Sequence, residues 1–139
     1  MNSEDQRADV MVDIASGGNA AARDWLRAWY RFCHLLDDLV DRDTPAPVPA
    51  NVVAASMVDF VQQMSFNPFY GMHKAQLFGL VVQAANAWVD SEEGAQPKDV
   101  LKGMWHEVVY HTAYITGGWT ALRAVSAHRE YDHERKEGQ

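Results

Sequence analysis

The sequence contains a single cysteine, Cys33, among its 139 residues. One thiol cannot form a disulfide within the chain, so a scaffold held together by disulfides is excluded and a reducing compartment is the simplest inference. Residues 1–9 are polar and acidic and do not resemble a signal peptide. We therefore expect a cytoplasmic protein.

Positive charge is also scarce. The chain has 12 Lys and Arg against 19 Asp and Glu, which gives a formal net charge of −7. No basic stripe is present to neutralise phosphates, so we expect no nucleic-acid partner. An acidic chain can still bind a phosphorylated ligand if metal ions supply the positive charge. The apolar runs are shorter than the roughly 20 residues of a membrane span, so no such span is expected.

Apolar residues are plentiful, at 47% of the chain, with five each of Trp, Tyr and Phe. This content supports a packed core, and the length fits one domain covering residues 1–139. Apolar spacing, caps and breakers predict an all-α, antiparallel bundle of about five to six helices. The helices should cover about 3–15, 20–41, 51–64, 68–90 and 98–116, with a last helix from about 119, and the ends 1–4 and 130–139 should fray.

The first notable segment is acidic and lies near the predicted end of the second helix. Asp37 and Asp41 are one turn apart, and Asp38 lies beside them. Like charges at this spacing repel, and the helix dipole disfavours negative charge at a C-terminus. A bound Mg²⁺ would explain the three carboxylates, since Mg²⁺ prefers oxygen ligands. The alternative is a solvated acidic helix end.

A second polar stripe ends the fourth predicted helix. Asn86, Asp90 and Glu93 follow an i, i+4, i+7 pattern, which aligns their oxygen atoms along one side of a helix. If the second and fourth helices face each other, the two segments form opposite walls of a metal site. Alternatively, Asn86 is a satisfied buried amide and the two acids belong to a polar helix end.

Taken together, the two segments resemble the squalene/phytoene synthase family of head-to-head isoprenyl diphosphate synthases. The run Tyr30-Arg-Phe-Cys-His-Leu-Leu-Asp37-Asp38-Leu-Val-Asp41 is similar to the first aspartate-rich motif of that family, and Gln83-x-x-Asn86-x-x-x-Asp90-x-x-Glu93 to the second. The resemblance implies a reduced terpenoid-synthase-like helical core in which Mg²⁺ ions bind and ionise a prenyl diphosphate. It also implies metal ligation by Asp37, Asp38, Asp41, Asn86, Asp90 and Glu93, with the three aspartates of the first motif in the catalytic role.

Other polar residues on these helices could assist. Arg27 and Arg31, with Tyr30 between them, lie one to two turns before the first motif and could bind diphosphate oxygens. The arginines could equally pair with surface acids. A further group, His106, Glu107 and His111, could contribute ligands or a general base, or simply belong to the packing of the fifth predicted helix.

Three hypotheses of function follow from the sequence. The first is Mg²⁺-dependent binding, and conceivably ionisation or transfer, of a small-molecule prenyl diphosphate. The second is an all-α nucleoside triphosphate pyrophosphohydrolase, although the expected Glu-x-x-Glu pair is missing. The third is a non-enzymatic helical interaction or assembly protein of viral or accessory type. A homodimer is compatible with each of them.

Overall fold

The structure, a computed structural model, describes residues 3–41, 47–97 and 103–128, and the prediction of an all-α bundle is confirmed there. Its elements are α1 (Ser3–Ser16), α2 (Ala20–Asp41), α3 (Ala50–Phe66), α4 (Pro68–Glu92), the short 3₁₀ helix η1 (Gly103–Trp105) and α6 (His106–Ser126). The expected fraying of residues 130–139 concerns a segment outside the described residues. None of the described helices combines the length and the apolar character needed to cross a membrane.

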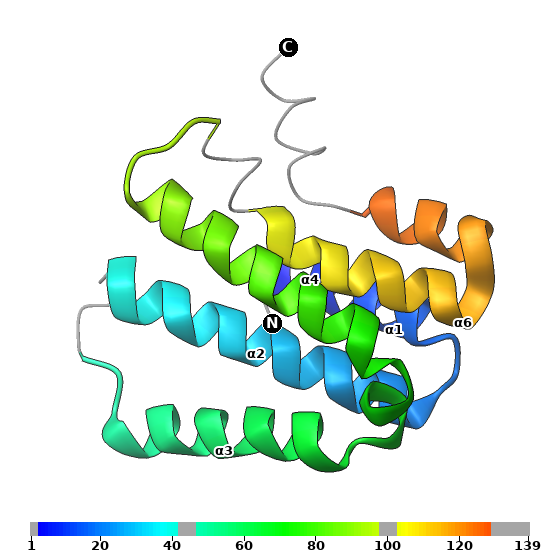
Figure 1. The fold of residues 1–139 in the computed structure, drawn as a ribbon, viewed down its shortest axis with the longest axis horizontal. Helices are drawn as coiled ribbons and strands as arrows, with labels where there is room; N and C mark the ends of the chain where they lie inside the picture. The colour runs from blue at the N-terminus through cyan, green and yellow to red at the C-terminus, as the bar shows by residue number, and fades with distance from the viewer. Residues whose placement is uncertain (1–2, 42–46, 98–102, 129–139) are drawn as a thin grey trace.

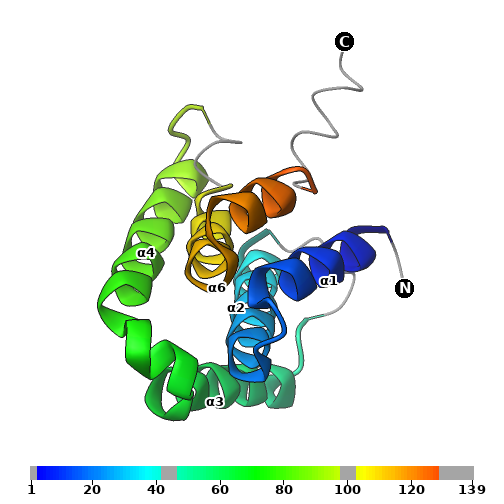
Figure 2. The same ribbon diagram turned by 90° about the vertical axis from the view of Figure 1, so that its right-hand side faces the viewer.

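Each helix packs against neighbouring helices, and these contacts determine which of its faces is buried. Helix α3 packs antiparallel against α2, and α4 returns from the end of α3, so that α2 and α4 run in the same direction (Figure 1). Helices α1 and α6 form the most extensive contact, and α1 also packs against another side of α2. Turned by 90°, the molecule has α4 at one edge (Figure 2).

The helix ends follow local signals. Gly17 and Gly18 adopt positive φ angles of 56° and 81° after α1, a conformation that glycine adopts without strain. The Asn19 side chain accepts a hydrogen bond from the Ala22 amide and caps α2. Thr116 in α6 donates a hydrogen bond to the Ala15 carbonyl at 2.7 Å, which fixes the end of α1 against α6.

Asn67 connects the corner between α3 and α4 to the start of α2. Its Oδ1 accepts hydrogen bonds from the amides of Phe69 and Tyr70, at 2.9 and 3.0 Å, and caps α4 ahead of Pro68. Its Nδ2 donates to the carbonyl oxygen of Ala21 at 2.8 Å. One buried side chain therefore caps the start of α4 and holds two distant segments together.

The core is centred on aromatic residues of α2. Trp25 is fully buried and stacks near Tyr70, with ring centroids 4.5 Å apart, and near Phe60 at 5.9 Å. Phe32 stacks on Phe60 at 4.3 Å. Helices α2, α3 and α4 thus share one aromatic cluster, and burial of such large rings is a leading source of stability.

Two breaks in helical geometry depart from straight helices. The fifth and sixth predicted helices lie on either side of Gly118 within the element α6, and the non-helical backbone there, with φ of 72° and ψ of −161°, agrees with the predicted break at the paired glycines. Helix α4 has a kink at His73, with φ of −118° and ψ of 16°, which the sequence did not predict. Each break separates two helical segments of the element that contains it.

Candidate functional site

One face of α2 carries most of the candidate residues. Positions separated by three or four residues lie on the same side of a helix. The face runs from cationic to anionic groups toward the C-terminus of the helix and comprises Arg27, Tyr30, Arg31, His34, Asp37, Asp38 and Asp41. This face of α2 therefore holds the three predicted diphosphate-binding residues next to the three aspartates of the first predicted metal-binding motif.

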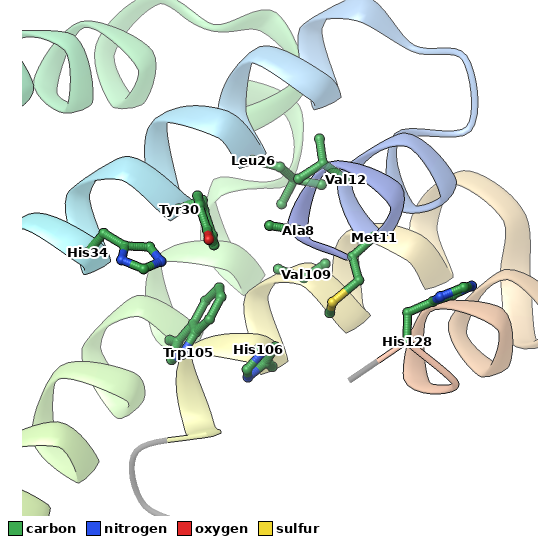
Figure 3. A pocket seen from close by; sticks show the side chains of 10 residues that line it. All are labelled: Ala8, Met11, Val12, Leu26, Tyr30, His34, Trp105, His106, Val109 and His128. Carbon is green, nitrogen blue, oxygen red and sulfur yellow. The ribbon is translucent and has the colours of Figure 1, made fainter. Parts of the chain in front are cut away.

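A pocket opens beside the middle of this face, between α1, α2 and α6 (Figure 3). Its volume is about 70 Å³. Its lining is mainly apolar at the base and aromatic at the rim, and consists of Ala8, Met11, Val12, Leu26, Tyr30, His34, Trp105, His106, Val109 and His128. An apolar pocket bordered by a few polar groups is the usual form of a small-molecule site.

Aromatic contacts hold the rim in place. The ring of Tyr30 lies edge-on to His34, at 4.5 Å, and 5.7 Å from Trp105. The rings of Trp105 and His106 are 3.9 Å apart. The Trp105 carbonyl accepts a hydrogen bond from Trp29 Nε1 at 3.0 Å, so α2 positions the start of α6.

A shallower cleft continues from the pocket toward the two arginines. It shares Ala8, Val12 and Tyr30 with the pocket and is also lined by one acidic residue, Asp9, and by Arg27 and Arg31. Arg31 donates to Asp59 of α3 at 2.7 Å. Arg27 is exposed and makes no hydrogen bond or ion pair with the rest of the described chain, so its charge is available to a ligand.

The first acidic segment has a specific contact with α4. Trp88 Nε1 donates a hydrogen bond to Asp37 Oδ1 at 2.8 Å, and both residues are half-buried. Asp38 is half-buried as well, while the side chain of Asp41 lies outside the described residues. Burial and, second, the nearby Asp37 carboxylate raise the pKa of the Cys33 thiol well above its ordinary range.

The second acidic stripe lies elsewhere on α4. Asn86 and Asp90 are each two positions from Trp88, and a separation of two residues corresponds to a rotation of about 200° around the helix axis. Since Trp88 contacts α2, these two side chains and that of Glu93 lie on the far side and are exposed. The two stripes therefore do not form facing walls, because α4 turns Ala84, Ala87 and Ser91 toward the core instead.

Metal ligands are consequently not preassembled in the part of the chain that is described. No three His, Cys, Asp or Glu side chains within it are grouped closely enough to hold a metal ion. The sequence left the roles of His106, Glu107 and His111 open. His111 Nε2 lies 3.4 Å from Oε1 of Gln76 in α4, whereas His106 lines the pocket. Glu107 is half-buried beside them in α6.

Sequence reasoning missed most of the lining residues, among them Met11 and His128. Neither belongs to a recognisable motif, and His128 follows the end of α6. They reach the pocket because α1 and α6 pack together, a contact between segments more than 100 residues apart. No local pattern could have indicated it.

Comparison of the chain with models of known families, with curated proteins and with solved structures finds no match. The similarity to squalene/phytoene synthases therefore stays a resemblance of two short motifs. The function has to be argued from the residues around the pocket.

Proposed function

We propose that the protein binds a small phosphate or diphosphate ester whose short apolar group enters the pocket between α1, α2 and α6. The observation that carries the proposal is the position of this apolar pocket on the cationic half of the α2 face, beside Arg27, Tyr30 and His34. A ligand with one apolar end and one anionic end matches both parts of that surface.

The apolar part of the ligand is limited in size. An apolar cavity of about 150 Å³ accommodates benzene. The volume here is about 70 Å³, less than half of that, so the pocket takes a short apolar group and cannot enclose a long chain without rearrangement. Among prenyl diphosphates, this favours a five-carbon compound over a long chain.

The anionic part would lie along the cleft. Among the described residues the Arg27 guanidinium has no hydrogen-bond or ion-pair partner, and guanidinium groups bind phosphate oxygens through two parallel hydrogen bonds. Tyr30 lies between the two arginines on the helix and borders both cavities. Arg31 is held by Asp59, so in this proposal Arg27 makes the main contribution to affinity.

Magnesium would enter together with the ligand. Mg²⁺ in phosphate-binding sites often takes one or two carboxylates and completes its coordination with water and phosphate oxygens. Asp37 and Asp38 follow the cationic residues on the same face of α2 but line neither cavity, and Asp37 is about 15 Å along the helix from Arg27. In this proposal they would hold Mg²⁺ only at the His34 end of the ligand. This arrangement requires no preassembled metal site, and Asn86, Asp90 and Glu93 take no part in it.

Calorimetry with dimethylallyl diphosphate, with and without Mg²⁺, tests the proposal. We expect binding that Mg²⁺ strengthens, and weaker binding of inorganic diphosphate, which has no apolar group. Arg27→Ala should weaken binding at least tenfold. Arg123→Ala is the matched control, because Arg123 is an exposed arginine of α6 that lies over the Trp119 ring.

A pocket-filling variant separates the contribution of the apolar group to binding from that of the anionic group. Ala8 lines both cavities and is half-buried, so Ala8→Phe should block the apolar group while the chain stays folded. We expect this variant to bind dimethylallyl diphosphate no better than inorganic diphosphate. Equal binding of the two compounds by the unchanged protein, or no binding of either, would refute the proposal.

A further inference from the structure

Helix α4 carries a second apolar stripe that the fold leaves uncovered. The stripe comprises Ala75, Phe78, Val82, Ala85 and Val89, all of them exposed. The exposed fractions of Phe78, Val82 and Val89 are 50%, 51% and 43%. Single apolar residues on a surface are ordinary, but five in register along one helix are not.

The spacing of this stripe is that of a coiled-coil seam. Its members are separated by three, four, three and four residues, the pattern of alternating a and d positions in a heptad. All five follow the kink at His73 and therefore belong to the straight part of α4. The opposite side of the same helix contains Leu77, Ala84 and Ala87, which face the core. Helix α4 thus has two apolar faces.

The place of α4 in the fold leaves this seam accessible. The helix lies at the edge of the molecule, outside α2 and α6 (Figure 2). A second helix could approach it without displacing any described element.

We propose that the seam binds the same seam of a second copy of this chain, with the two α4 helices antiparallel. In an antiparallel pair, each a position lies opposite a d position. Ala75 then faces Ala85 of the second copy, and Phe78 faces Val82, while Val89 lies beyond these paired positions. Every contact occurs twice about a two-fold axis, as a closed dimer requires. The paired alanines let the helices approach closely.

Charge favours this orientation. Lys74 is exposed at the N-terminal end of the seam, and Asp90 and Glu93 are exposed at its C-terminal end. A parallel pair would bring the acidic ends of the two copies together. An antiparallel pair separates these ends and brings each one alongside the end that carries Lys74, and it also opposes the two helix dipoles.

The dimer should be weak. A standard protein interface covers roughly 800 Å² on each partner, and contact along one helix of this length covers less. We therefore expect association that depends on protein concentration in the micromolar range. This inference is independent of the ligand proposal, since the pocket lies on the α1 and α6 side of α2.

Sedimentation of the full chain across micromolar to millimolar concentrations tests the dimer. The average mass should rise from 15.6 kDa toward twice that value. Val82→Glu should keep the protein monomeric throughout. Val58→Glu on α3 is the matched control, because Val58 is exposed to 59% outside the seam and its substitution should leave the association unchanged. Circular dichroism verifies that both variants fold.

Disulfide formation tests the orientation. Ala75→Cys and Ala85→Cys proteins, each carrying Cys33→Ser, should form a covalent dimer mainly when mixed and much less when oxidised separately. Covalent dimers formed equally well by each protein alone would indicate a parallel pair and overturn the proposal. A monomeric parent protein at all concentrations would overturn it too, as would dimers that survive Val82→Glu or dissociate with Val58→Glu.

Discussion

The hydrogen bond between Trp88 and Asp37 joins the candidate site to the fold, and Trp88→Phe removes it while keeping most of the aromatic surface. Hydrogen bonds to charged groups contribute about 1.5–3 kcal/mol when buried. Both residues here are half-buried, so water can replace part of the interaction. We therefore expect a loss of about 1–1.5 kcal/mol in the free energy of unfolding, at or just below the lower limit of that range.

The single substitution Asp37→Ala cannot measure this bond. It breaks the contact with Trp88, but it also removes a negative charge that lies beside Asp38 and near the C-terminus of α2. The helix dipole and the neighbouring carboxylate make that charge unfavourable, so the two effects have opposite signs. The net change could be close to zero even when the hydrogen bond is strong.

A double-mutant cycle isolates the interaction. The free energies of unfolding of the parent protein, Trp88→Phe, Asp37→Ala and the double variant, measured in urea, give the coupling energy. We expect about 1 kcal/mol of coupling. Trp119→Phe provides a control at a tryptophan that is 65% exposed and should change stability little. A coupling energy within experimental error of zero would show that the contact does not stabilise the packing of α2 on α4.

Two further predictions concern stability. Asn67→Ala removes the cap of α4 and the hydrogen bond that Asn67 Nδ2 donates to the Ala21 carbonyl, so we expect a loss of about 2–3 kcal/mol, visible as a lower urea midpoint; a loss below about 0.5 kcal/mol would contradict this role. The pKa of Cys33 is raised in the folded state, so the folded thiol stays protonated while the unfolded one ionises above roughly pH 8.5, and stability should fall as the pH rises beyond that value. Cys33→Ala should flatten this part of the pH profile, and an unchanged slope would refute the assignment.

Local structure followed closely from local sequence. The bounds of α2 and the cap at Asn67 could be predicted because they depend on residues within one or two turns: apolar spacing, a side-chain acceptor and a following proline. The kink at His73 could not, since no proline or glycine occupies that position. It lies where the ring of His73 contacts Phe69, with centroids 4.9 Å apart, next to the packed corner of α3 and α4.

The relation between the two acidic segments required the tertiary structure. Each segment was visible in the sequence, and so was the alignment of its residues along one side of a helix. Which side of α4 faces α2 depends on competition among all the residues of that helix. Burial of Leu77, Ala84 and Ala87 outweighs any arrangement that would bring Asn86 and Asp90 toward Asp37.

The sequence by itself determined that this protein is helical, where most of its helices begin and end, and that α2 presents arginines and then aspartates along one face, because these properties arise from side chains a few residues apart. Only the tertiary structure decided that this face borders an apolar pocket and that the stripe of Asn86, Asp90 and Glu93 lies outside it. The physical reason is that helix rotation and helix pairing are set by the total apolar surface that packing buries, which no single motif controls.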